Sequence, residues 1–235
     1  MNLLLLHPDD HWLDHRSVHL DDQRAEHIRT VLKPSVGDAL RAGMVGGQQG
    51  RAVITALTSE GVCLQVDLQD PPPPRHPFDI VLALPRPKML RRLLRTVAEF
   101  GVANLHLINS ARVEKSFWQS PLLAKSSLEE ALLAGMERAS DTLMPVVHQH
   151  QRFRPFVEDR LVELCDGRPC LVAQMGSVNA LRDRSPAPAV VLVGPEGGFV
   201  PFELDLLQRV IARPVHLGSR TLSVDTALTT VLAQG

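Results

Sequence analysis

The 235-residue sequence has no tyrosine, and only 4% of its residues are aromatic. This scarcity argues against an RNA-binding platform of the RRM type, which stacks bases on aromatic side chains. Cysteine is also rare: Cys63, Cys165 and Cys170 form an odd set without CxxC spacing. We interpret them as reduced core thiols of a cytoplasmic protein and expect neither a disulfide framework nor a zinc site. The ten histidines show no metal-ligand spacing, so no metal is expected.

Neither sign of charge is in excess, because 25 basic residues are balanced by 26 acidic ones. This balance excludes a protein that coats nucleic acid through bulk positive charge, but it allows a local basic patch. Long apolar runs are missing too. The run Leu3 to Leu6 is too short for a signal peptide, and no stretch is long enough to span a bilayer. We therefore expect no membrane partner.

Four consecutive prolines at positions 71–74 mark a domain boundary, because they favour a stiff extended connector. Before them, short strand-like segments at 39–44, 51–57 and 61–68 accompany a short helical pattern at 21–31. We predict a small β-barrel for residues 1–72.

After the prolines, apolar strand patterns alternate with helical patterns. Strands are predicted at 78–84, 103–108, 145–148, 169–174, 189–193 and 214–217. Helices are predicted at 87–100, 121–140, 153–165, 201–212 and 224–233. Such alternation indicates an α/β domain over residues 73–235, with a mainly parallel sheet covered on both faces.

Two of these predicted strands run into glycine. The strand at 189–193 is followed by Gly194-Pro195-Glu196-Gly197-Gly198, and the strand at 214–217 by Gly218. Glycine lets a backbone turn sharply and leaves its N–H groups open to a ligand, and parallel α/β sheets bind ligands at the carboxyl ends of their strands. We expect the two strand ends to lie side by side as two walls of one pocket, although the first loop alone also suits a phosphate or an ordinary turn.

The pocket sequences belong to a longer pattern, with GPEGGF at 194–199 followed by Leu217, Gly218, Arg220, Leu222, Asp225, Thr226 and Ala227. Further matching positions are His27, Val31, Leu32, Lys33, Gly37, Asp38, Ala98, Glu99 and Gly101. Through these residues the chain resembles, over nearly its whole length, the RsmE family. These are bacterial enzymes of the SPOUT class that methylate N3 of a uridine in 16S ribosomal RNA.

The resemblance implies a fold and partners. Residues 73–235 would form a SPOUT methyltransferase domain whose C-terminal chain makes a trefoil knot around S-adenosylmethionine, and residues 1–72 a PUA-like domain for RNA recognition. The implied partners are 16S ribosomal RNA or the small ribosomal subunit, and a second copy of the chain. We expect a homodimer that buries the apolar terminal helix, with Leu228, Val231 and Leu232.

The same resemblance assigns a cofactor site to the glycine loops and the apolar residues beside them. Its expected members are Leu192, Gly194, Pro195, Glu196, Gly197, Gly198, Leu217, Gly218, Leu222 and Ala227.

Three charged residues are candidates for catalysis. Methylation of uridine N3 requires removal of the N3 proton, which a carboxylate such as Asp225 would accept while Arg220 stabilises the negative charge on the base. Glu196 would pair with the donor or the base. Each carboxylate also has a structural alternative, since Glu196 would suit local N–H groups of its turn and Asp225 would suit a helix cap.

Basic residues suggest where RNA binds. Positions 88, 91, 92 and 95 share one face of the helix predicted at 87–100, a face that suits a phosphate backbone but is often merely solvated. The RNA-binding candidates are Lys33, Arg86, Lys88, Arg91, Arg92, Arg112 and Arg138.

The chain departs from the family pattern at several positions, including Arg138 in place of a glutamine and Val200 where the family often has a serine. Ser223 replaces an arginine, Asp225 a glutamate, and Asp141 an arginine of the expected RNA cleft. These changes keep two alternatives open: a catalytically weakened RNA-binding paralogue, and a nucleotide- or phosphate-binding enzyme that uses the Gly194–Gly198 loop.

Overall fold

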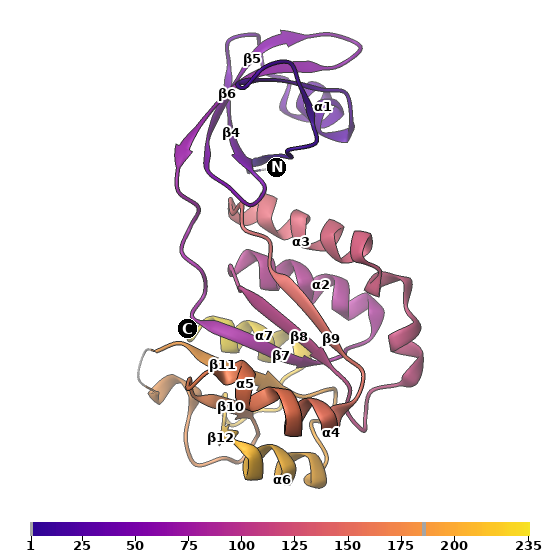
Figure 1. Ribbon diagram of the computed structural model, residues 1–235, viewed down its shortest axis with the longest axis vertical. Helices are drawn as coiled ribbons and strands as arrows, with labels where there is room; N and C mark the ends of the chain where they lie inside the picture. Colours follow the sequence, from indigo (N-terminus) through magenta and orange to yellow (C-terminus); the bar gives the residue numbers. More distant parts are fainter. Residues whose placement is uncertain (1, 185–186) are drawn as a thin grey trace. The chain divides into compact units, whose positions relative to one another are not determined.

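The structure is a computed structural model that describes residues 2–184 and 187–235. It contains two compact units (Figure 1). The first holds the chain up to Pro74 together with Leu133–Met144, and the second holds Arg75–Leu132 and Pro145–Gly235. The prolines thus separate the units, but the return of residues 133–144 to the first unit has no counterpart in our domain prediction. Within the described ranges, no helix is long and apolar enough to cross a membrane.

The first unit is built on a curled six-stranded sheet with the order β1-β4-β5-β6-β3-β2. Strands β1 and β4 are parallel, and the other neighbours are antiparallel. The strands are β1 (Leu4–Leu6), β2 (His11–Trp12), β3 (Ser17–Leu20), β4 (Ala39–Met44), β5 (Gln49–Leu57) and β6 (Val62–Asp70). Helix α1 (Gln23–His27) continues into a π-helical turn, Ile28–Leu32, as the helical pattern at 21–31 predicted.

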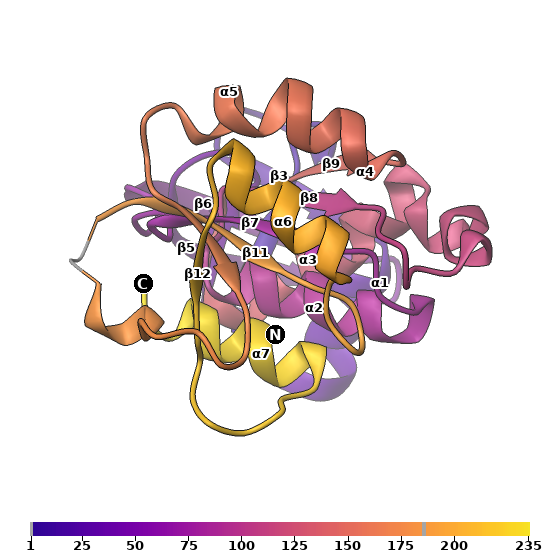
Figure 2. The same ribbon diagram turned by 90° about the horizontal axis from the view of Figure 1, so that it is seen from below.

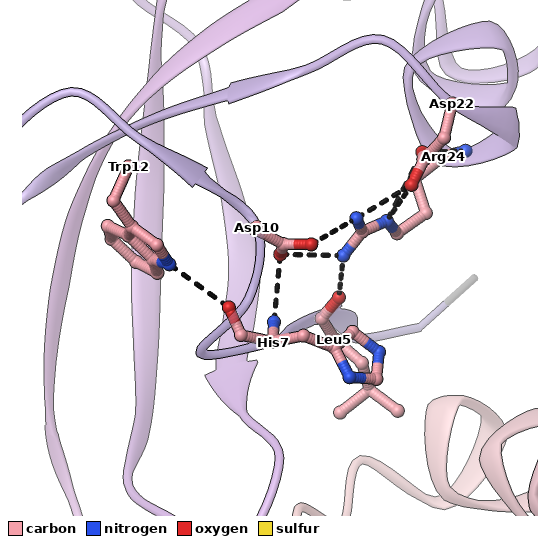
Figure 3. Close-up of polar contacts among 6 residues, drawn as sticks. All are labelled: Leu5, His7, Asp10, Trp12, Asp22 and Arg24. Atoms are coloured by element: carbon pink, nitrogen blue, oxygen red, sulfur yellow. Dashed lines mark hydrogen bonds and ion pairs between the residues drawn. The ribbon is translucent and has the colours of Figure 1, made fainter.

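A half-buried arginine ties the start of the chain to α1. Figure 3 shows the Arg24 guanidinium donating to Asp10 Oδ1 (2.6 Å) and to the Leu5 carbonyl (2.8 Å), while Asp22 pairs with its other edge. Asp10 also accepts from the His7 N–H (2.8 Å). The loop between β1 and β2 is therefore fixed by charge-assisted hydrogen bonds rather than by apolar packing alone.

The segment 133–144 completes the first unit through backbone contacts. The Leu3 N–H donates to the Glu137 carbonyl (3.1 Å), and the Gly46 N–H donates to the Thr142 carbonyl (2.7 Å). Asp141 is only 3% exposed and accepts from the Leu143 N–H (2.9 Å). Our expectation that Asp141 places an anion in an RNA cleft was therefore wrong, because this carboxylate stabilises a buried turn.

The second unit contains an entirely parallel six-stranded sheet with the order β12-β10-β11-β7-β8-β9. Its strands are β7 (Phe78–Ala83), β8 (Asn104–Ile108), β9 (Val146–His150), β10 (Cys170–Ala173), β11 (Ala189–Val193) and β12 (Arg213–Val215). Its helices are α2 (Pro87–Glu99), α3 (Lys125–Ala139, which ends in the first unit), α4 (Phe153–Pro155), α5 (Leu161–Cys165), α6 (Pro201–Val210) and α7 (Val224–Leu232), with a π-helical turn Phe156–Arg160 between α4 and α5. Helices α2 and α7 cover one face of the sheet, and α4, α5 and α6 cover the other (Figures 1 and 2).

This architecture confirms the α/β fold with a parallel sheet, and each predicted strand and helix of the second unit has a counterpart. Two expectations were wrong. Strands β11 and β12 are not neighbours, because β10 pairs with both of them. The apolar residues Leu228, Val231 and Leu232 are not available for a dimer, because all three are buried within the protomer. The trefoil knot and the dimer stay predictions.

Three histidines stack on strands β8 and β9. The His106 ring lies parallel to that of His148 at a centroid distance of 4.4 Å, and His106 Nδ1 is 3.2 Å from His150 Nε2. Burial foremost, and then the neighbouring His148 and His150, lower the pKa of His106 to about 3. His106 is therefore neutral at pH 7.

Candidate active site

A cavity of about 680 Å³ opens at the carboxyl ends of β10, β11 and β12. Three loops form it: one follows β10, one is the glycine loop Gly194–Gly198 after β11, and one follows β12. Its volume lies in the ordinary range for small-molecule sites. Most of the wall is apolar, from residues such as Val193, Phe199 and Leu217, which suits a planar heterocycle.

The structure brings nearly all predicted cofactor residues to this cavity. The residues that line it are Gly194, Pro195, Glu196, Gly197, Gly198, Leu217, Gly218, Leu222 and Ala227. Leu192 is the exception. Its side chain is fully buried in β11, the central partner of β7 and β10, and does not reach the cavity.

The glycine loop has a conformation that needs glycine, since Gly197 and Gly198 have φ values of +83° and +75°. Arg112, predicted to bind RNA, lies on the loop after β8 and donates from Nη1 to the carbonyls of Gly197 and Gly198, the second at 3.1 Å. A side chain at Gly197 would meet the Arg112 guanidinium. Arg112 therefore supports the loop's shape, whatever contact it makes with RNA.

Glu203 is a buried residue that joins the loop after β8 to the start of α6, which follows the glycine loop. It is 4% exposed, and its two carboxylate oxygens accept from the Ala111 N–H (2.6 Å) and the Val200 N–H (3.0 Å). Val200 is the N-cap of α6 and has no hydroxyl to accept from the Glu203 N–H, which donates instead to the Val200 carbonyl (2.9 Å). The Glu203 carboxylate accepts from the Val200 N–H, as the N3 residue of a capping box does. One buried carboxylate thus holds the start of α6 against the loop after β8.

Both candidate catalytic carboxylates are paired with arginines at α2: Arg92 lies in the helix, and Arg86 is the N-cap residue that precedes it. Arg92 Nη1 lies 2.9 Å from Asp225 Oδ2, and Arg86 Nε lies 3.7 Å from Glu196 Oε1. The Ser223 hydroxyl donates to Asp225 Oδ1 (2.5 Å). Ser223 foremost, and then Arg92, hold the pKa of Asp225 below its ordinary value. Asp225 is therefore an ionised, oriented carboxylate beside the cavity, and Arg220, the third candidate, lines the cavity itself.

The other basic candidates divide between the units. Lys88, Arg91 and Arg95 are exposed on α2 in the second unit, and Arg91 pairs with Glu130 of α3 at 3.3 Å. Lys33 and Arg138 are exposed in the first unit. Lys33 has a left-handed conformation at the end of the π-helical turn after α1.

One wall of the cavity was not predicted from the sequence. Ala173, Gln174 and Met175, at the end of β10, line it together with the two glycine-bearing loops. The apolar strand PCLVAQ was recognised, but it is followed by neither an immediate glycine nor a charged residue that signals a ligand. The position of β10 between β11 and β12 is the information that was missing.

Comparison with known proteins places this architecture in a family. The family model described as "RNA methyltransferase domain" matches residues 72–234. The chain belongs to the RNA methyltransferase domain family. The matched region contains the whole second unit's parallel sheet and all three loops of the cavity.

Individual relatives agree with this assignment. The chain is 29% identical to a "Ribosomal RNA small subunit methyltransferase E" of Treponema pallidum, over 88% of this chain and 79% of that protein. A protein of the same name from Mycobacterium tuberculosis is 26% identical over 91% of this chain and 83% of its own length.

Solved structures share the fold. The crystal structure of a ribosomal RNA small subunit methyltransferase E from Neisseria gonorrhoeae, bound to S-adenosylmethionine, has a TM-score of 0.77 at 21% identity and covers 99% of this chain and 95% of its own. A putative methyltransferase from Legionella pneumophila in complex with the same cofactor has a TM-score of 0.75 at 19% identity, covering 99% and 96%. At these identities the likeness establishes the fold.

Proposed function

We propose that this chain is an S-adenosylmethionine-dependent methyltransferase that methylates N3 of a uridine in 16S ribosomal RNA. The observation that carries the proposal is the cavity at the ends of β10, β11 and β12, which gathers the glycine loops, the carboxylates and the arginines at one sheet edge. Membership of the RNA methyltransferase domain family supports the reaction type, and the names of the relatives support the small-subunit substrate.

The residues of the cavity fit the methyl donor. Its apolar walls suit the adenine ring, and the glycines keep side chains out of the space beside the loop backbone. Bound S-adenosylmethionine supplies an electrophilic methyl group for transfer to a nucleophilic nitrogen. The residues that would hold it are those of the three loops. Gly197 and Gly218 belong to the two glycine-bearing loops that the sequence predicted as walls of the pocket.

The protein's own contribution is to prepare the uridine nitrogen. The N3 lone pair becomes available when the N3 proton leaves, and Asp225 is the carboxylate we assign to accept that proton. It is ionised at neutral pH because Ser223 and Arg92 favour its charged form. Arg220, which lines the cavity with an exposed side chain, would stabilise the negative charge left on the base oxygens.

Substrate RNA would be held by cations. The exposed face of α2 carries Lys88, Arg91 and Arg95. The same helix supplies Arg92 to Asp225, and its N-cap residue Arg86 pairs with Glu196. Phosphate contacts there would place the target base near the cavity. The first unit would add recognition through Lys33 and Arg138, in keeping with the predicted PUA-like role. We also propose a homodimer and a cytoplasmic location, where ribosomal RNA is found.

The test is direct methylation. Purified protein, labelled S-adenosylmethionine and 30S subunits from cells that lack the corresponding activity are combined, and modified nucleosides are identified by mass spectrometry. The proposal requires a single N3-methyluridine in 16S RNA, and its formation should weaken as salt is raised, because phosphate contacts release counterions. Methyl transfer to another nucleoside would keep the enzyme class and reject the substrate.

One observation bears on the alternative of a non-catalytic RNA-binding paralogue. Ser223, which replaces a family arginine, donates a hydrogen bond to Asp225. This contact supports an organised catalytic carboxylate. Titration with ATP and S-adenosylmethionine distinguishes both alternatives from the proposed function. Preference for ATP indicates a nucleotide- or phosphate-binding enzyme, and binding of neither ligand indicates the RNA-binding paralogue.

A further inference from the structure

A buried amide oxygen in the wall of the cavity has no partner. Gln174 directly follows β10 and lines the cavity. Its Oε1 is shielded from solvent and, within the described part of the chain, receives no hydrogen bond. Its backbone is fixed on both sides: the N–H donates to the Val215 carbonyl (2.8 Å), and the carbonyl accepts from Ser177 Oγ (2.8 Å). The side chain is therefore anchored at its base and unsatisfied at its tip.

Gln174 differs in this respect from the other polar side chains of the cavity. These belong to exposed residues, which water can satisfy: Glu196, Arg220, Thr221 and Ser223. A buried acceptor without a donor destabilises the folded protein, whereas a ligand that brings a donor removes that cost on binding. The position of Gln174 in the cavity wall makes a ligand the natural source of the missing hydrogen bond.

We infer that Gln174 Oε1 accepts a hydrogen bond from an N–H or O–H group of the methyl donor and so contributes to its selection. The inference rests on the proposed function, because S-adenosylmethionine is the ligand assumed to fill the cavity. That molecule has polar hydrogens in two places, on its nucleoside part and on its amino-acid ammonium group. An acceptor that is already desolvated discriminates against ligands that present an acceptor or a methylene group at the same point.

Calorimetric titration of the full-length protein with S-adenosylmethionine tests the inference. Gln174→Leu removes the acceptor at similar volume, and Gln174→Glu retains an oxygen acceptor. Gln208→Leu is the matched control, because Gln208 is exposed on α6 and lies outside the cavity. We expect Gln174→Leu to bind about tenfold more weakly, which corresponds to about 1.4 kcal/mol. The other two variants should stay within about threefold of wild type.

Thermal unfolding without ligand separates a contact with the donor from a structural role. Loss of an unsatisfied buried amide should leave the melting temperature of Gln174→Leu unchanged or higher. Weaker binding combined with undiminished stability is the expected signature. A lower melting temperature with unchanged affinity, or an equal affinity loss in Gln174→Leu and Gln174→Glu, would overturn the inference.

Two further measurements complete the design. If wild type fails to bind S-adenosylmethionine at all, the proposed function itself is rejected, which distinguishes that failure from a failure of Gln174 alone. Titration with 5′-methylthioadenosine, which lacks the amino-acid part, identifies the donor group. A tenfold effect of Gln174→Leu that persists with this ligand assigns the nucleoside, and an effect seen only with S-adenosylmethionine assigns the ammonium group.

Discussion

The guanidinium of Arg92 on α2 lies 2.9 Å from the carboxylate of Asp225 on α7. The sequence placed these residues 133 positions apart and gave them separate roles, one in RNA binding and one in catalysis. Their contact joins the two roles, because a cation on the proposed phosphate-binding face also helps to lower the pKa of the proposed base. Binding of RNA to α2 would therefore change the environment of Asp225 directly.

Replacement of Arg92 by alanine should alter the pH dependence of methylation. Arg92 helps to lower the pKa of Asp225, after the larger effect of Ser223. Its loss should raise that pKa toward the ordinary value, so that activity begins to fall at a higher pH as the medium is acidified. The measurement is kcat as a function of pH between about 4 and 8.

Arg95→Ala is the matched control, since it removes a cation from the same exposed face of α2. Both variants should weaken RNA binding to a similar degree. Only Arg92→Ala should shift the pH at which kcat falls on acidification. If kcat fell at the same pH in the two variants, Arg92 would act only as an RNA ligand.

Asp225→Asn should lower kcat by about a hundredfold or more, the usual contribution of a positioned general base. Glu196→Gln should have a smaller effect, because Glu196 is held by one ion pair at 3.7 Å whereas Asp225 is fixed by Ser223 and Arg92 together. Single-turnover rates with saturating S-adenosylmethionine measure the chemical step. A larger loss in Glu196→Gln would transfer the role of base to Glu196.

The elements of the second unit were predictable because buried parallel strands are continuous apolar runs bounded by glycine, proline or polar residues. Strand β11, predicted at 189–193, has those bounds in the structure. The order of strands was not predictable, because periodicity within a strand carries no information about its neighbours. Gln174 and Met175 were missed for that reason: β10 lies between β11 and β12 only in three dimensions.

Two other differences have the same origin. The helical pattern of α3 is continuous, so nothing in the sequence marks Leu133 as the point where the chain returns to the first unit. The apolar face of α7 signalled burial correctly, but Leu228 and Val231 are buried within their own protomer. An apolar helix face predicts that the face is buried, but it does not identify the element or the subunit that covers it.

Gly218→Val should abolish binding of S-adenosylmethionine without greater loss of stability than a matched change elsewhere. Gly218 lines the cavity and has a φ of +138°, and Gly46 in the first unit has a φ of +79°. Neither has an atom within 4 Å of an added Cβ. Valine at either position should therefore cost similar backbone strain. Calorimetry and thermal unfolding of both variants provide the comparison, and normal affinity in Gly218→Val would remove this loop from the binding site.

Glu203→Ala should destabilise the protein by about 3 kcal/mol, because it leaves the N–H groups of Ala111 and Val200 without their acceptor. Affinity for S-adenosylmethionine should fall as well, since this residue fixes the start of α6, directly after the glycine loop that lines the cavity. Denaturant unfolding measures the first effect. Asp205→Ala, an exposed change on the same helix, is the control and should change stability by less than about 0.5 kcal/mol.

Acid should destabilise the protein through His106, on a path independent of the active site. The ordinary pKa of histidine is 6.5, and that of His106 is about 3 in the folded protein. Below pH 6.5 His106 therefore binds a proton in the unfolded chain but stays unprotonated in the folded protein. Stability contributed by the neutral form is fully present above that pH and is lost at up to about 1.4 kcal/mol per pH unit as the pH falls toward 3.

The comparison that isolates this effect is wild type against His106→Gln, measured by denaturant unfolding at a series of pH values. His106 is only 7% exposed and packs against His148, His150 and Phe156, so the variant should be less stable at pH 7.5. The pKa of His150 is also lowered, mainly by burial and then by His148, and these causes are present in both proteins. The difference between the two proteins should therefore shrink steadily below pH 6.5. Parallel stability curves from pH 7.5 to 4 would mean that His106 takes up its proton in the folded state, and the stacked arrangement with His148 would not be what governs its charge.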